Sequence, residues 1–202
     1  KNSITIMIIT AILISVSYVH TVIWDKHAFN IVPLKVKQLL NLSTSSNLIE
    51  MADICNDRLM PACAEKAYIQ ALKKEPHNQE ILAALGTLQD KMSKKNLALA
   101  TYGLYFTNGG TDSDIAYHYA KVLDQFHRVD DAKKYYEYSL NAKPHIFQVT
   151  ISKNYVTFLM KHNFLRQAKA FILKVRKQGE NAPYFMDDEL VEIKKRLVVA
   201  SR

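Results

Sequence analysis

The sequence has few of the residue patterns on which catalysis and metal binding depend. It contains only two cysteines, Cys55 and Cys63, and their spacing is too wide for a CxxC redox motif. Its seven histidines form no HExxH motif and no tight metal-ligand spacing. The Gly109-Gly110 pair lacks the lysine and the preceding strand that a phosphate-binding loop requires. The sequence therefore predicts a protein that is not an enzyme and that holds no cofactor or metal.

Acidic residues are also missing from one long stretch, between Glu137 and Glu180, although the whole chain carries a formal net charge of +8. We expect a basic patch there that attracts an acidic protein or anionic lipid headgroups, and the alternative is a solvated face with no fixed partner. Nucleic acid is not predicted, because aromatic residues are not interleaved with these cations. The predicted patch consists of Lys161, Arg166, Lys169, Lys174, Arg176 and Lys177.

The strongest positive signal is a period of 34 residues. Pro76 and Pro144 stand two periods apart, and each follows small and aromatic residues at the same offsets. A period of this length is typical of stacked helix–turn–helix repeats. The matching positions are Ala64, Tyr68 and Ala71 before Pro76, Ala98 and Tyr102 one period later, and Ala132, Tyr136 and Ser139 before Pro144.

The pattern resembles the tetratricopeptide repeat (TPR). Four units cover residues 45–180: they begin at Ser45, Gln79 and Ser113, and the fourth follows a slip of two residues. In the second unit Tyr105 stands where a small residue is usual, and Gly110 replaces the final proline. The resemblance implies an all-α, TPR-like solenoid of three to four repeats that binds protein. Such hairpins bury their apolar faces only by stacking.

Local signals predict the boundaries of several helices. Pro61 begins one helix, and Asn108-Gly109-Gly110 ends another before a cap at Asp112 or Ser113. Residues 181–202 are expected to form a capping helix, because Met186, Leu190, Ile193 and Leu197 share one face. Its first turn is acidic and its later turns are basic, which suits the helix dipole.

Residues 4–24 form an uncharged apolar run, apart from His20, that is long enough to cross a bilayer. We predict a transmembrane anchor over residues 1–24 and a juxtamembrane linker over residues 25–44. The alternative is a cleaved signal peptide, with an apolar core over residues 4–14 and small residues at Ser15 and Ser17. A soluble or secreted TPR adaptor or chaperone would then result.

Two signals bear on the compartment. Lys26, Lys35 and Lys37 follow the apolar run, which favours a cytoplasmic repeat domain under the positive-inside rule. Cys55 and Cys63 lie on the two antiparallel helices of one predicted hairpin, close enough to form a disulfide in an oxidising compartment. The alternative is two reduced cysteines packed in the core. We expect a single-pass protein of the bacterial inner membrane with a periplasmic repeat domain, the cytoplasmic side remaining the alternative.

The first helices of the repeats are expected to line a groove for a protein partner. The lining is mixed in polarity, which suits an extended peptide or a partner helix. It lacks the ordered cations with which chaperone-docking TPR proteins clamp a C-terminal carboxylate. The predicted lining residues are Ile49, Asp53, Asn56, Thr87, Asp90, Tyr117, Lys121, Asp124, Lys153 and Thr157.

These features together predict a membrane-anchored protein-binding scaffold, an accessory or assembly subunit of a membrane or envelope complex. Its partners are expected to be protein subunits of that complex and the membrane itself, with no small-molecule substrate. An enzyme whose site forms only between the repeats and a partner is the remaining class.

Overall fold

A computed structural model describes residues 34–38, 43–141, 148–178 and 186–199. These residues are helical apart from turns and caps, and no strand occurs among them. The structure divides into two compact units, residues 1–94 and 95–202, which are described separately. The division falls inside the second predicted repeat, a feature that the 34-residue period does not indicate.

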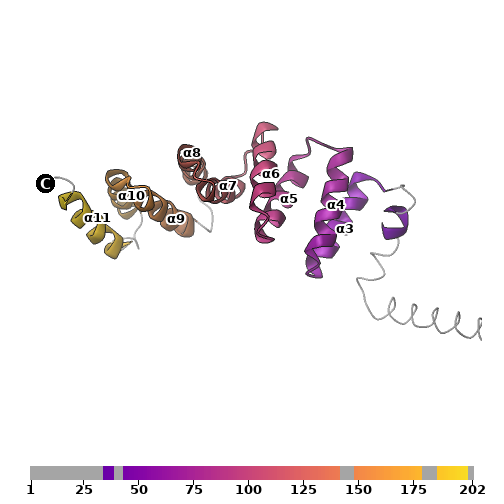
Figure 1. Cartoon of the computed structure of the whole chain (residues 1–202), viewed down its shortest axis with the longest axis horizontal. Coiled ribbons are helices and arrows are strands. Elements are labelled where there is room, and N and C mark those ends of the chain that lie inside the picture. The colour runs from indigo at the N-terminus through magenta and orange to yellow at the C-terminus, as the bar shows by residue number, and fades with distance from the viewer. Residues whose placement is uncertain (1–33, 39–42, 142–147, 179–185, 200–202) are drawn as a thin grey trace, which may run out of the picture. The chain divides into compact units, whose positions relative to one another are not determined.

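The described helices are short and of similar length (Figure 1). Unit 1 holds a helical turn over residues 34–38 and the helices α3 (Ser45–Asp57), α4 (Pro61–Lys74) and α5 (Gln79–Lys91). Unit 2 holds α6 (Lys95–Thr107), α7 (Ser113–Gln125), α8 (Val129–Asn141), α9 (Gln148–Lys161), α10 (Leu165–Gln178) and α11 (Asp187–Val199). The predicted all-α class and the helix–turn–helix order are confirmed.

The core of unit 1 is built from the predicted repeat positions. Ala52 and Ala64 are fully buried, and these small side chains let α3 and α4 pack closely. Tyr68 is 3% exposed and donates a hydrogen bond of 2.8 Å to Asp53. Burial first, and then this bond to a carboxylate, raises the pKa of Tyr68, so the phenol keeps its proton. The same core takes in Leu34 from the helical turn.

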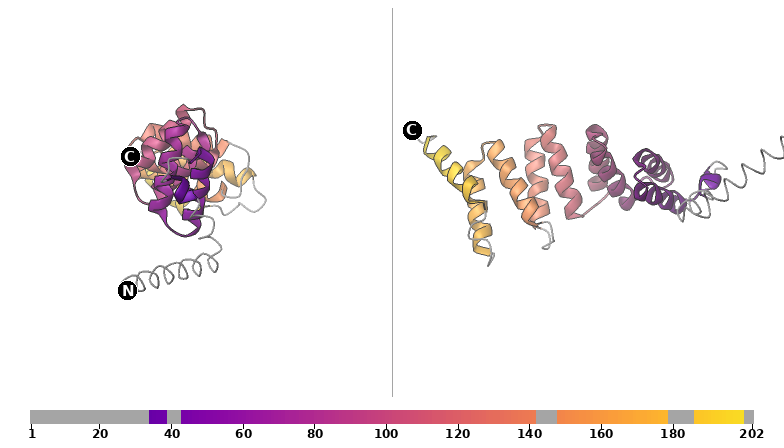
Figure 2. Two further views of the ribbon diagram at one scale, coloured as in Figure 1. Left: turned by 90° about the vertical axis from the view of Figure 1, so that its right-hand side faces the viewer. Right: turned by 90° about the horizontal axis from the view of Figure 1, so that it is seen from below.

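The core of unit 2 repeats the same arrangement. Ala120 and Ala132 are fully buried where α7 packs on α8, and Tyr136 is 3% exposed between α8 and α9. Figure 2 shows the helices of this unit in sequence, with α9 beside α10 and α11 beside α10. Val156, which stands where a small residue is usual, is accommodated at 0% exposure. The fourth repeat, which follows the slip of two residues, therefore forms a complete hairpin.

The 34-residue period also appears in the backbone conformation of the turns that join the two helices of each repeat. Leu59, Ser93, His127 and Asn163 adopt positive φ angles of 56°, 59°, 57° and 62°, and they are spaced by 34, 34 and 36 positions. The residue after each donates its N–H to the carbonyl five positions earlier, as in Met60 to Cys55 and Phe164 to Leu159. This is the Schellman end of a helix. The last spacing is the two-residue slip of the fourth unit.

A positive φ costs an ordinary residue energy that glycine does not incur. Leu59 is 87% exposed, so its side chain contributes little packing to offset that cost. We expect Leu59→Gly to raise the free energy of unfolding by about 0.5–1 kcal/mol, after the greater unfolded-state entropy of glycine is subtracted. Chemical denaturation measures this. Leu59→Ala keeps the Cβ and should bring no such gain; an equal gain would contradict the backbone explanation.

The second repeat departs from the usual pattern at Tyr105 and Gly110, and the structure shows that these two residues are packed against each other. Tyr105 is 5% exposed, and its hydroxyl accepts a 2.9 Å hydrogen bond from the Asp112 N–H. A Cβ on Gly110 would lie 2.2 Å from the Tyr105 ring, so only glycine fits beneath it. Gly109, at φ 83°, completes the turn. The large Tyr105 side chain thus packs directly over the Gly110 backbone.

The predicted helix ends are confirmed at three places. Pro61 opens α4, the helix α6 ends at Thr107 before Asn108-Gly109-Gly110, and Asp112 caps α7 through the N–H groups of Asp114 and Ile115. Thr44 in addition caps α3 in a capping box with Asn47. At the other end of the chain, α11 packs on α10 with Leu190 and Ile193 buried, as expected for the capping helix.

The predicted anchor, residues 1–24, lies outside the described residues. Among the residues that the structure does describe, none forms a helix of the length and apolar character needed to span a bilayer.

Candidate protein-binding site

In unit 2, a row of polar side chains on α7 lies opposite a second row on α9, and we call these rows the two polar stripes. On α7, Tyr117, Lys121 and Asp124 follow one another at intervals of four and three residues, which places them on one helix face. On α9, Asn154, Thr157 and Lys161 recur at three and four residues. Each set is exposed or half-buried, so the side chains remain accessible.

Two polar contacts between the stripes hold them in register. The Asn154 side-chain amide donates to the Tyr117 hydroxyl, 37 positions away, and the Lys161 ammonium reaches the two Asp124 carboxylate oxygens at 3.0 and 2.9 Å, again 37 positions away. Lys121 lies over the Tyr117 ring, 5.4 Å from its centroid. The same offset at both contacts shows that the two helices are matched along this face.

Between these contacts lies a hollow of about 190 Å³. It is too small and too open to the surface for an enclosed ligand site, and its polar groups suit the backbone or a side chain of a docked peptide. We call it the α7–α9 hollow. Its lining residues are Lys121, Asp124, Gln125, Tyr136, Asn154, Thr157, Phe158 and Lys161.

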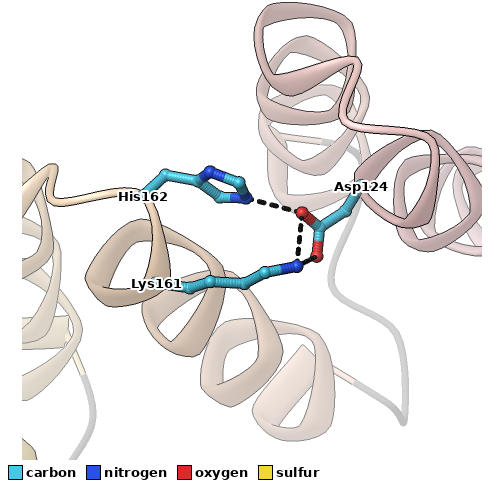
Figure 3. Close-up of polar contacts among 3 residues, drawn as sticks. All are labelled: Asp124, Lys161 and His162. Carbon is cyan, nitrogen blue, oxygen red and sulfur yellow. Dashed lines mark hydrogen bonds and ion pairs between the residues drawn. The ribbon is translucent and has the colours of Figure 1, made fainter.

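The Asp124 carboxylate is contacted by two side chains at the end of α9, Lys161 and His162 (Figure 3). Its carboxylate accepts from the Lys161 ammonium and lies 2.6 Å from the His162 ring Nε2. Burial acts to raise the pKa of Asp124, but the bonds from Lys161 and His162 outweigh it and hold that pKa below its usual value of 3.8. The carboxylate therefore joins α7 to the end of α9.

We expect Asp124→Asn to lower the free energy of unfolding of unit 2 by about 1–2 kcal/mol, because two charge-assisted contacts are weakened. Since the folded pKa is depressed, the contribution of the wild-type carboxylate is complete above pH 3.8 and is lost as the pH falls through the folded pKa. Denaturation between about pH 3 and 7 measures this. Glu50→Gln, on the exposed face of α3, is the control; an equal effect there would refute a specific role for Asp124.

The structure divides the ten predicted groove residues between the two units. Ile49, Asp53 and Asn56 share one face of α3, where Asp53 and Asn56 both contact the Tyr68 hydroxyl. Thr87 and Asp90 are half-buried on α5. The pairing of Asp53 with Tyr68 gives this predicted groove residue a role in packing.

In unit 2, three of the eight residues that line the α7–α9 hollow are among the predicted groove residues. These predicted residues are Lys121, Asp124 and Thr157. Lys153, which was also predicted, is exposed and does not line the hollow. Asn154 and Gln125 were missed. The signal for Asn154 was its place three residues before Thr157, which puts both on one face of α9.

The predicted basic patch separates into two groups. Lys161 is paired with Asp124, and Arg176 is paired with Asp187 in the first turn of α11. No described carboxylate pairs with the other four cations of the patch. These are Arg166, Lys169, Lys174 and Lys177, all on α10.

In the structure the sulfur atoms of Cys55 and Cys63 are joined, with the two Cα atoms 5.8 Å apart. The bond links α3 to α4 across their turn, and Cys55 is fully buried. As for metal ligands, no cluster of three histidine, cysteine or acidic residues forms within the described ranges.

No protein-family model matches the sequence, and no curated protein matches it either. Solved structures do match its fold. A tetratricopeptide repeat protein from Parabacteroides merdae is 19% identical, with a TM-score of 0.61, over 78% of this chain and 66% of that one. MamA from Desulfovibrio magneticus RS-1 is 13% identical, with a TM-score of 0.63, over 78% and 88%.

A third match is YrrB, a TPR protein with an unusual peptide-binding site, which is 13% identical, with a TM-score of 0.61, over 80% of this chain and 91% of that one. At these identities the likeness concerns the fold. The fold is therefore an all-α, TPR-like solenoid, as the 34-residue period predicts.

Proposed function

We propose that this chain is a protein-binding scaffold anchored in a membrane, serving as an accessory or assembly subunit of a membrane or envelope complex. The observation that carries the proposal is the α7–α9 hollow. It presents Lys121, Gln125 and Thr157 between two fixed polar contacts, and a peptide backbone or side chain is the ligand that such a mixed surface suits.

The fold supports protein binding for a physical reason. The tyrosines and small residues of the repeats are used in packing, so the polar faces of α7 and α9 are left to make contacts outside the unit. YrrB, which shares the fold, has a peptide-binding site. A segment lying along the α7 and α9 stripes would meet Lys121 first, then the Asp124–Lys161 pair. That order favours a peptide with a carboxylate or carbonyl beside Lys121.

Membrane anchoring is supported by the uncharged run over residues 4–24. A tether of this kind raises the effective concentration of the hollow beside its partner, so a weak contact is converted into a nearly intramolecular one. Affinity for an isolated peptide need not be high. A periplasmic repeat domain is part of this proposal, and it is supported by the joined sulfurs of Cys55 and Cys63, which favour an oxidising compartment.

Deletion of residues 1–24 tests the anchoring. We expect the shortened chain to be folded and released from membranes, and to lose its partner in affinity purification from native membranes. Stoichiometric co-purification of the shortened chain would show that the segment is not needed for function. A mature N-terminus near Tyr18, found by mass spectrometry of the full-length product, would instead favour the secreted adaptor.

Thiol labelling tests the compartment separately. Cys55 and Cys63 should resist a thiol reagent in native membranes and react only after reduction and unfolding. Free thiols in protein that has been isolated from native membranes and unfolded without reductant would contradict a periplasmic location and would leave protein binding untouched.

A further inference from the structure

A second and larger hollow lies between α10 and α11, outside the α7–α9 hollow. Its volume is about 760 Å³. Its wall is made by the start of α10 and the second half of α11, two helices that pack against each other within unit 2. No residue of the α7–α9 hollow takes part. We call it the α10–α11 hollow.

The floor of the α10–α11 hollow is apolar. Leu165 is 5% exposed and belongs to the core, and Phe164 and Leu197 pack against that core while remaining half-exposed to the hollow. Val199, at 73% exposure, lies at its edge. An apolar floor that solvent reaches gains energy when a partner's apolar side chain covers it, by about 25 cal/mol for each Å² removed from water.

The rim carries an excess of positive charge. Arg166, Lys195 and Arg196 line the hollow, against one acidic residue, Glu192. Among described carboxylates, none pairs with Arg166 or Lys195. The Arg196 guanidinium makes a long 3.5 Å contact with the Asn163 side chain. Two of these cations are therefore available to a ligand from outside.

Four other cations of the predicted basic patch lie in different surroundings. Lys161 and Arg176 are used by Asp124 and Asp187. Lys174 and Lys177 are exposed on α10 but do not line the hollow. At the α10–α11 hollow, Arg166 and Lys195, which pair with no described carboxylate, stand beside an apolar floor. This combination distinguishes a site from a generally basic face.

We propose that the α10–α11 hollow is a second docking site, which takes an acidic peptide segment carrying a large apolar side chain. The apolar side chain covers Phe164 and Leu197, while carboxylates beside it in the peptide pair with Arg166 and Lys195. Charge complementarity selects the acidic segment, and Glu192 in the wall disfavours a uniformly anionic surface such as a lipid bilayer. The exposed lining of the hollow suits a peptide that lies across it.

The probe is a fluorescein-labelled peptide of about ten residues, rich in Glu and Asp with a central Leu-Phe pair, titrated by anisotropy into the full chain in uncharged detergent at about 0.1 M salt. Arg166→Glu combined with Lys195→Glu should weaken binding at least tenfold. The matched control, Lys174→Glu with Lys177→Glu, makes the same charge change on exposed positions outside the hollow and should weaken binding less than threefold. Val199→Asp, at the edge of the hollow, should weaken binding of the peptide by a factor between those of the two charge-reversed pairs.

Several outcomes would overturn this proposal. Equal losses in the two charge-reversed pairs would mean diffuse attraction, and equal binding of a peptide with Ser in place of Leu-Phe would mean that the floor is not used. No binding of the peptide, with capture of phosphatidylglycerol vesicles that depends on Lys174 and Lys177, would assign the cations to the membrane. Asn154→Ala, in the α7–α9 hollow, should leave the affinity unchanged, and circular dichroism should show every variant folded.

Discussion

Replacing Cys55 and Cys63 together by alanine will lower the free energy of unfolding of unit 1 by about 2–3 kcal/mol, the loss expected when a short closed loop is opened. The two residues are eight positions apart and join α3 to α4. The bond restricts the unfolded chain at the hairpin that begins the repeats.

Hydrogen exchange of the α3 and α4 amides, measured by mass spectrometry in the full chain, reports this loss for unit 1 specifically. Protection in the wild type should fall on addition of reductant to the level of the alanine pair. The alanine pair should not respond to reductant. If the wild type were equally protected with and without reductant, the link would contribute nothing to the stability of unit 1.

Gly110→Ala will destabilise unit 2 by about 2–3 kcal/mol, because the added methyl group overpacks a filled site. The new Cβ would lie 2.2 Å from the Tyr105 ring, and that ring is 5% exposed and cannot turn outward freely. Moving it also weakens the hydrogen bond from the Asp112 N–H to its hydroxyl, at the residue that caps α7. The effect should therefore reach the start of α7.

A double-mutant cycle separates this explanation from a general intolerance of side chains at Gly110. In a Tyr105→Ala background, Gly110→Ala should cost less than about 0.5 kcal/mol, which gives a coupling energy of at least about 1.5 kcal/mol. Equal costs in the two backgrounds would show that the ring is not the reason for the glycine. Gly103→Ala is the control within α6, since its added Cβ would make only an ordinary 3.4 Å contact.

The repeat columns were predictable because they depend on a few packing rules. Ala52 and Ala132 must be small where helices approach, and Tyr68 and Tyr136 must be large where hairpins stack, so their spacing is visible in the sequence. The link between Tyr105 and Gly110 was not predictable. Each was recognised as a departure from the repeat, but only the positions of the ring and the backbone show that one departure requires the other.

The charges illustrate why the candidate site was harder to predict. The stretch without acidic residues contains Lys161 and Arg176, yet both are neutralised by carboxylates from outside it, Asp124 and Asp187. A run of charges in the sequence shows only which charged residues are neighbours along the chain. An ion pair depends on which helices pack together in the fold. Fewer cations of the patch are therefore unpaired than the sequence suggests, and among the four without a described carboxylate partner Arg166 lines the α10–α11 hollow.

The most direct test of protein binding by the α7–α9 hollow is site-specific photo-crosslinking in native membranes. A photoreactive side chain at Thr157, which is exposed and lines the hollow, should give one dominant crosslinked protein. The same group at Lys134, exposed on α8 and outside the hollow, should not. Equal crosslinking at the two positions, or none at Thr157 while the partner still co-purifies, would contradict binding at this site.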